Sequence, residues 1–264
     1  MIKKLLQRLF KRDDQPADTR RSPDLGKRDY KKILHLSDLH VINEETERQW
    51  LEAAKTIIEC YDPSEWVIVV TGDLVDHGKA TEYIRLTDGF IALNAAGFTV
   101  YIVPGNHDYG PWGNVYRANA HKNFTYFCEK YADAHAFPAM VDFGPWRLLL
   151  LDSTAHGEDG ELFARGRIGK EQIAWLESRL SDPRPTWIAL HHRPYWSNIF
   201  LSIVDRKDLT DLVERRTKRG RLVKYLCGHR HIEDLGVVAA GKFLDDRRIL
   251  EIDPVNGEVR SRAL

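Results

Sequence analysis

From residue 31 onward, two patterns of hydrophobic positions alternate along the chain. Short apolar runs predict strands that are buried on both faces, at 33–36, 66–70, 98–103, 147–151, 186–190 and 222–226. Between them, apolar residues spaced three or four positions apart predict helices at 45–60, 80–96, 170–180 and 207–219. Strands and helices that alternate in this way predict an α/β fold in which helices cover largely parallel sheets.

Two stretches depart from this alternation. Residues 112–136 are rich in aromatic side chains and predict an irregular, partly helical insert. After residue 232 the pattern changes to short strands, and Asn256-Gly257 predicts a tight turn between two of them. The carboxyl end of the chain is therefore expected to contain a β-hairpin.

The first twelve residues carry a third pattern, that of a basic amphipathic helix. The apolar residues that share one face of this helix are Ile2, Leu5, Leu6, Leu9 and Phe10. Lysine and arginine supply most of the other face, which favours binding to an anionic membrane surface; docking on a protein or a frayed tail are the alternatives. Residues 13–29 contain two prolines, many charges and few apolar side chains, which predicts a flexible linker. We expect the globular domain to span residues 30–264.

Composition narrows the class of protein. The chain has 39 basic and 39 acidic residues, so no specific binding to nucleic acid is expected. Its three cysteines are widely spaced and odd in number, which favours a reducing compartment over a disulfide framework. No apolar run approaches the roughly 20 residues that span a bilayer. We expect a cytoplasmic protein, peripheral on the inner face of the membrane if residues 1–12 bind lipid.

Polar side chains follow five of the predicted strands. The motifs are DLH (38–40), GDLVD (72–76), GNHD (105–108), HHRP (191–194) and GHRH (228–231). Because the carboxyl ends of strands in an α/β sheet converge on one crevice, we expect these residues to meet. Imidazole, carboxylate and amide ligands suit Zn, Fe or Mn ions better than Ca²⁺. The number of candidate ligands predicts two ions roughly 3.5–4 Å apart, with one carboxylate shared between them.

The five motifs together resemble those of the calcineurin-like metallophosphoesterases. They are most similar to the bacterial branch of class III cyclic-nucleotide phosphodiesterases and glycerophosphodiesterases, over residues 31 to about 232. The resemblance implies a four-layer αββα sandwich with a dinuclear site that holds two divalent or trivalent transition metal ions, Mn, Fe or Zn.

The resemblance also implies which residues hold the ions. The ligands of the first ion would be Asp38, His40 and His231. The ligands that complete the second ion would be Asn106, His191 and His229. Asp73 would bridge the two ions, and family usage selects His191 rather than the adjacent His192.

The catalytic residues implied in the same way come from GNHD. A hydroxide between the ions would attack phosphorus in line. His107 would stabilise the phosphoryl oxygens or protonate the leaving alkoxide, and Asp108 would orient its imidazole.

Three further residues are candidates for substrate binding. Arg193 stands where this branch usually has proline, and its guanidinium would clamp a phosphate, the alternative being a surface ion pair with a neighbouring acid. Tyr109 and Trp112 follow GNHD closely and would stack on a base or pack on an acyl chain, the alternative being packing in the core or within the insert.

The sequence therefore predicts a dinuclear-metal phosphoester hydrolase, a phosphodiesterase acting on a small nucleotide or lipid-linked substrate. One alternative is a phosphomonoesterase. Another is a membrane-surface hydrolase of a lipid-linked phosphoester or pyrophosphate, similar to UDP-diacylglucosamine hydrolases. Residues 1–12 favour this second alternative, whereas GNHD counts against it, because those enzymes usually carry a different motif there. A metal-free binding module is disfavoured because no ligand of the set is missing.

Overall fold

The computed structural model describes residues 24–27, 29–154, 164–195, 202–217, 220–229 and 237–264. Within them, one sheet has six strands in the order β1 (Asp24–Lys27), β5 (Ala139–Asp142), β6 (Arg147–Leu150), β7 (Thr186–Ala189), β8 (Val223–Cys227) and β9 (Val237–Ala239). The other has five, in the order β11 (Val259–Ala263), β10 (Arg248–Ile252), β2 (Lys32–Leu36), β3 (Trp66–Thr71) and β4 (Val100–Val103). The pairs β2–β3, β3–β4, β6–β7, β7–β8 and β8–β9 are parallel.

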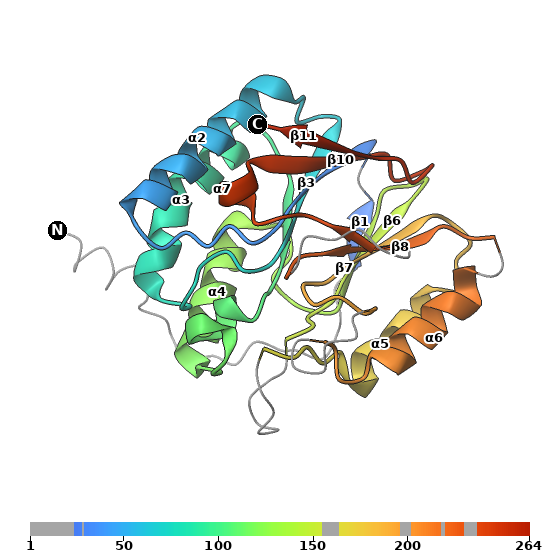
Figure 1. Cartoon of the computed structure of the whole chain (residues 1–264). Helices are drawn as coiled ribbons and strands as arrows, with labels where there is room; N and C mark the ends of the chain where they lie inside the picture. Colours follow the sequence, from blue (N-terminus) through green and yellow to red (C-terminus); the bar gives the residue numbers. More distant parts are fainter. Residues whose placement is uncertain (1–23, 28, 155–163, 196–201, 218–219, 230–236) are drawn as a thin grey trace.

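Helices cover the outer face of each sheet (Figure 1). The five-stranded sheet carries α2 (Glu44–Cys60), α3 (Ala80–Ala95), α4 (Ala118–Tyr131) and the short α7 (Phe243–Asp246). The six-stranded sheet carries α5 (Gly169–Arg179) and α6 (Arg206–Thr217) on the opposite side of the molecule. The order helix, sheet, sheet, helix is the predicted four-layer αββα sandwich, which is confirmed.

Strands in this architecture are apolar at every position because both of their faces are buried. In β3, Ile68 and Val70 pack under the helices, while Val67 and Val69 point into the layer between the sheets. The central strand β6 divides its leucines in the same way between the two sides of its sheet. Continuous apolar runs are therefore what a sandwich with covered sheets requires.

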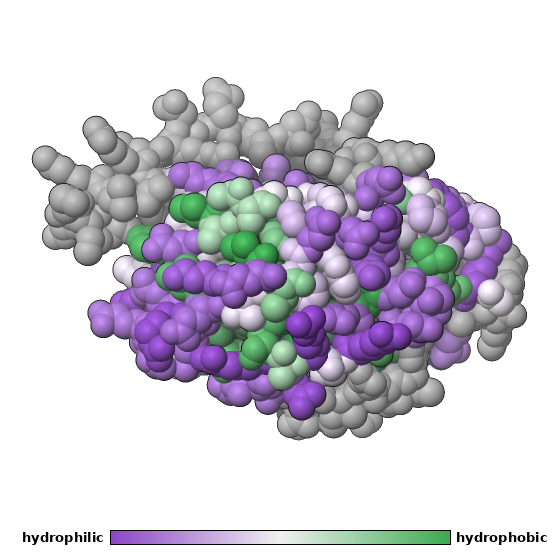
Figure 2. Space-filling model, turned by 90° about the horizontal axis from the view of Figure 1, so that it is seen from above, coloured by the Kyte–Doolittle hydropathy of each residue, from purple (hydrophilic) through white to green (hydrophobic). Residues whose placement is uncertain are grey.

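The predicted strands and helices are confirmed, with ends that differ by one or two residues. The hairpin around Asn256-Gly257 joins β10 to β11. The predicted insert 112–136 is more regular than expected, because most of it forms α4. On the face drawn in Figure 2, most of the coloured surface is hydrophilic, and the hydrophobic areas lie among the hydrophilic ones.

The amino-terminal part differs from the expected linker in one respect. Residues 24–27, inside the predicted linker 13–29, form β1 and pair in parallel with β5. Strand pairing needs backbone hydrogen bonds rather than apolar side chains, so the polar sequence carried no sign of it. The predicted helix 1–12 lies outside the described residues. None of the described helices combines the length and the hydrophobicity needed to cross a bilayer.

Candidate metal centre

Side chains from several strand ends of both sheets meet at one point. Nε2 of His191, at the end of β7, lies 3.2 Å from Oδ2 of Asp73 and 3.0 Å from Oδ1 of Asn106. Nδ1 of His229, which follows β8, lies 3.1 Å from the same nitrogen. All four side chains are buried or partly buried. One group of potential metal ligands is thus assembled from elements that lie far apart in the sequence.

A second group adjoins the first and shares one residue with it. Nε2 of His40 lies 3.9 Å from Oδ1 of Asp38 and 3.7 Å from Oδ2 of Asp73. The same Oδ2 of Asp73 faces His191 in the first group. Asp73 therefore occupies the place of a carboxylate that is common to two ligand sets.

The separations around His191 fit a bound metal ion. Ligand atoms that each lie about 2.1 Å from one ion are roughly 3.0–3.4 Å from one another, and the distances around His191 Nε2 are 3.0, 3.1 and 3.2 Å. The set also combines nitrogen and oxygen donors, as Zn, Fe and Mn sites do. The described residues form three groups of carboxylates and histidines, the third being His40, Asp76 and His107. Five predicted ligands fall into the other two, namely Asp38, His40, Asp73, His191 and His229, and Asn106 contacts the group around His191. His231, the seventh, lies outside the described residues.

Other polar groups fix the orientation of the candidate ligands. Nδ1 of His191 donates to the backbone carbonyl of Thr71 at 2.7 Å, so its Nε2 is left for the site. Nδ1 of His40 lies 3.1 Å from a carboxylate oxygen of Asp76. The backbone N–H of His229 donates to Asp38 at 3.1 Å. Such outer partners are typical of histidines that ligate metals.

The backbone at this site is strained. Six described residues other than glycine have positive φ, and four of them are predicted ligands: Asp38, His40, Asp73 and His229, with φ between 45° and 64°. This conformation costs on the order of 1–3 kcal/mol per residue and persists where a functional geometry requires it. The turns after β2, β3 and β8 are therefore shaped to aim side chains rather than to minimise local energy.

Electrostatics favour positive charge beside Asp73. Burial would raise the pKa of Asp73, but the nearby histidines hold that pKa well below its usual range. Burial would lower the pKa of His191, but the charges of Asp73 and Asp38 and the hydrogen bonds to Asp73 and Thr71 together raise this pKa to about 9. The carboxylate of Asp73 is thus matched by positive charge on its histidine neighbours, which a metal ion would replace.

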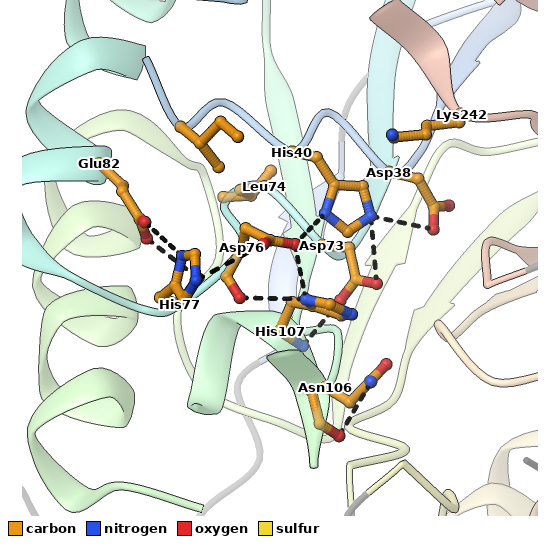
Figure 3. A network of polar contacts seen from close by, with 12 residues as sticks. Asp38, His40, Asp73, Leu74, Asp76, His77, Glu82, Asn106, His107 and Lys242 are labelled. Carbon is orange, nitrogen blue, oxygen red and sulfur yellow. Dashed lines mark hydrogen bonds and ion pairs between the residues drawn. The ribbon is translucent and has the colours of Figure 1, made fainter. Parts of the chain in front are cut away.

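His107 faces this centre, and its orienting partner is not the predicted one (Figure 3). Its Nδ1 donates to the backbone carbonyl of Asp76 at 3.0 Å and lies 3.0 Å from the Asp76 carboxylate. Its backbone N–H donates to Asp73 at 2.9 Å. Among the described residues, no group pairs with Nε2 of His107, which is the nitrogen left for a substrate.

Asp108 has a structural place instead, so the role predicted for it is wrong. Its carboxylate accepts hydrogen bonds from the N–H groups of Leu74 and Gly105 and from the hydroxyl of Tyr83. It is fully buried. The short 3-10 turn η1 (His107–Tyr109) points the adjacent side chains of His107 and Asp108 in different directions.

Asp76 belongs to this centre by its contacts, although the sequence analysis did not single it out as a site residue. One carboxylate oxygen contacts both His40 and His107, and the other lies 3.7 Å from Nε2 of His77. Nδ1 of His77 is in turn 2.7 Å from Glu82, so Figure 3 shows a continuous polar chain from Glu82 to Asp38. The motif GDLVD contained the signal, because a second carboxylate, Asp76, stands three residues after Asp73.

The three predicted substrate residues have different outcomes. Tyr109 is buried, stacks on His121 and donates to Asp152 at 3.0 Å, so its predicted contact with substrate is wrong. Arg193 is buried too, which rules out a surface ion pair, and its phosphate contact stays a prediction. Trp112 is exposed at the edge of the site.

Two known proteins that are similar to this chain are named as phosphodiesterases. A glycerophosphodiester phosphodiesterase of Enterobacter lignolyticus is 30% identical over 171 residues, which are 62% of this chain and 55% of that protein. A 3′,5′-cyclic adenosine monophosphate phosphodiesterase of Vibrio vulnificus is 30% identical over 181 residues, 66% of this chain and 57% of that protein. The chain thus spans little more than half the length of these two relatives.

Solved structures agree on the fold. A purple acid phosphatase from yellow lupin superposes with a TM-score of 0.59 at 13% identity, covering 90% of this chain and 54% of that chain. A 5′-nucleotidase from Candida albicans has a TM-score of 0.51 at 11% identity, covering 91% and 52%. Residues 31–233 match the family described as calcineurin-like phosphoesterases. With its motifs, its fold and this match in agreement, the chain belongs to the calcineurin-like phosphoesterase family.

Proposed function

We propose that this protein is a dinuclear-metal phosphoester hydrolase and that its substrates are phosphodiesters. The observation that carries the proposal is the position of Asp73, whose Oδ2 faces His40 in one ligand group and His191 in the other. Two ions that share a carboxylate are the arrangement used for in-line displacement at phosphorus.

The proposed ligands follow from the two groups. Asp38, His40 and Asp73 would hold one ion, together with His231. Asp73, Asn106, His191 and His229 would hold the other. When bound, the ions supply Lewis-acid charge at the phosphoryl oxygens and lower the pKa of a coordinated water. The mixed nitrogen and oxygen donors support Mn, Fe or Zn as the metals.

His107 is proposed as the residue that exchanges a proton with the leaving oxygen. Its Nδ1 must carry a proton, because its partner is a backbone carbonyl, which accepts hydrogen bonds and cannot donate them. The tautomer is thereby fixed, and Nε2 is the nitrogen that meets the substrate. Asp76 positions the ring, and it also holds His40, so the two functions are coupled through one carboxylate.

Diesters are favoured over monoesters by the relatives. The two described above are named for glycerophosphodiesters and for 3′,5′-cyclic adenosine monophosphate. A diester carries one negative charge on its phosphate at neutral pH. We therefore propose a small phosphodiester, of the nucleotide or glycerol type, as the substrate.

The test uses two substrates with the same leaving group. Protein treated with EDTA and reloaded with Mn²⁺ should hydrolyse bis(p-nitrophenyl) phosphate faster than p-nitrophenyl phosphate, and the EDTA-treated sample should be inactive. Negligible turnover of both substrates after reloading would overturn the proposal. In the same assay, His107→Ala should keep its metal while turnover collapses; loss of metal as well would make His107 a structural residue.

We also propose that residues 1–12 attach the protein to an anionic membrane surface on the cytoplasmic side. The support is the sequence pattern alone, a basic face opposite an apolar one. In co-sedimentation, the full-length protein should bind phosphatidylglycerol vesicles more than phosphatidylcholine vesicles. A full-length variant with Leu5→Gln and Leu9→Gln should lose this binding, and equal binding by both proteins would refute the membrane role.

A further inference from the structure

Trp112 is the most exposed large hydrophobic side chain among the described residues. It is 66% exposed, compared with 41–49% for the others of that class. Its backbone has φ 53° and ψ 19°, a left-handed conformation that a bulky side chain rarely adopts. Trp112 thus joins the proposed ligands Asp38, His40, Asp73 and His229 among the strained residues, although it holds no metal.

The turn that presents Trp112 is packed directly against the reacting groups. The carbonyl of Gly113 accepts a hydrogen bond from Nδ2 of Asn106 at 3.1 Å. A Cβ atom on Gly113 would lie 1.9 Å from that nitrogen and 2.9 Å from Nε2 of His107, so only glycine fits there. The N–H of Trp112 donates to the carbonyl of Asp76 at 3.1 Å. The backbone of Trp112 is therefore fixed next to Gly113, which packs against Nε2 of His107, the nitrogen proposed to meet the substrate.

One side of the indole has a defined neighbour. The rings of Trp112 and His77 meet edge to face, with centroids 5.4 Å apart and an interplanar angle of 72°. His77 is itself fixed by Glu82 at 2.7 Å. The indole thus has a neighbour on one side, while most of its surface stays in contact with solvent. An exposed aromatic residue in a strained backbone conformation beside a candidate site has the properties of a binding platform.

The surroundings indicate what the platform binds. Beside His77, a cavity of about 600 Å³ opens between the first turns of α3 and α4. Its lining includes the polar side chains of Lys79, Arg117 and Asn119. The surface of the cavity is mostly apolar, with these polar side chains among it. A nucleobase needs a flat apolar face for its ring, which the exposed indole of Trp112 offers, and polar groups at its edge, which the lining of the cavity beside His77 offers.

We propose that Trp112 is a platform on which the base of a nucleotide phosphodiester stacks, so that the enzyme prefers substrates with a base over glycerophosphodiesters. This inference rests on the proposed function, because it assigns the substrate class of the same site. Trp112 acts on specificity and has no part in the displacement at phosphorus.

The test compares ligands with and without a base, on the full-length protein loaded with Mn²⁺. In wild-type protein, kcat/KM for 3′,5′-cyclic adenosine monophosphate should exceed that for glycerophosphocholine. Trp112→Ala should lower the first by about tenfold, as loss of one base–aromatic stack does, and change the second less than twofold. Trp112→Phe should retain most of the activity. Ile91→Ala, which removes another exposed apolar side chain, should leave both values unchanged.

Binding of one product and of its counterpart without a base supplies a readout that does not depend on turnover. By calorimetry, adenosine 5′-monophosphate should bind wild-type protein more tightly than ribose 5-phosphate, and Trp112→Ala should remove the difference. A Trp112→Ala variant that lowers kcat/KM for both substrates equally, or for neither, overturns the platform. So does equal binding of the two ligands by wild-type protein. If wild-type protein hydrolyses neither these substrates nor bis(p-nitrophenyl) phosphate, the proposed function fails, and the binding comparison still decides the role of Trp112.

Stability separates the platform from a structural role. Because Trp112 is exposed and strained, Trp112→Gly should keep or raise the melting temperature. A fall of several degrees in that variant would show that the indole stabilises the fold, and would overturn the assignment.

Discussion

Replacing Asp76 by alanine tests the arrangement around His107 and His40 in one experiment. Its Oδ1 lies 3.0 Å from Nδ1 of His107 and 3.1 Å from Nδ1 of His40. The substitution removes different numbers of hydrogen-bond partners from the two histidines. His107 keeps the backbone carbonyl of residue 76 as its hydrogen-bond acceptor, whereas Asp76 is the partner that orients Nδ1 of His40.

The magnitudes follow from this difference. At His107 the loss is limited to the charged contact, about 1.5 kcal/mol, which corresponds to roughly tenfold in kcat/KM. At His40 the outer partner of a proposed ligand is lost, which costs about 10–100-fold in metal affinity. The Asp76→Ala enzyme should therefore need more Mn²⁺ and should remain about tenfold slower at saturation.

The assay is hydrolysis of bis(p-nitrophenyl) phosphate over a series of Mn²⁺ concentrations, which separates the two effects. Asp76→Asn is the matched variant, because it keeps an acceptor oxygen without the charge, and its loss should be smaller. If Asp76→Ala matched wild-type protein at every Mn²⁺ concentration, the role assigned to Asp76 would be refuted.

Three other predictions address the buried His35, the loop that contains Gly113, and the binding of Mn²⁺. Burial lowers the pKa of His35 to about 3, so the folded state binds this proton less readily than the unfolded state. The free energy of unfolding therefore falls as the pH falls from 6.5 toward 3, and the loss due to His35 between pH 7 and 5 is about 2 kcal/mol. Glutamine in His35→Gln can keep the hydrogen bond to Thr71. In urea unfolding at pH 7 and pH 5, this variant should lose about 2 kcal/mol less stability between the two pH values than wild-type protein does, and equal losses would contradict the assignment. Gly113→Ala and Gly169→Ala both force alanine into a left-handed conformation, but only Gly113 faces Asn106, so only Gly113→Ala should abolish hydrolysis; retained activity would show that the loop is not packed as described. Mn²⁺ at 100 times its Kd should stabilise the metal-free protein by about 2.7 kcal/mol, seen as a rise in melting temperature, and no rise would mean that the native state does not bind the metal.

Much of the fold could be predicted from the sequence, because the signals for it are local. Strands such as β3 and β6 are buried on both faces and are apolar throughout. The short β1 gave no such signal, since backbone pairing with β5 carries it. The convergence of the ligand motifs could also be predicted, because each one directly follows a strand.

The partners of His107 could not be predicted in the same way. Asp108 is its neighbour in the chain, but the turn directs that carboxylate to Leu74, Gly105 and Tyr83. Asp76 is distant in sequence and reaches His107 only because β3 and β4 are adjacent. The burial of Tyr109 likewise depends on α4, whose His121 stacks on its ring. Contacts of this kind are set by tertiary packing, which sequence adjacency does not reveal.

The most direct test of the dinuclear centre is the metal content of the protein after loading with Mn²⁺ and removal of free metal. Wild-type protein should retain about two ions per chain. Asp73→Ala, which removes the carboxylate common to both ligand groups, should retain less than one and lose hydrolysis of bis(p-nitrophenyl) phosphate. Wild-type protein that is active with no more than one ion, or an Asp73→Ala variant that keeps two, would contradict the shared position of Asp73.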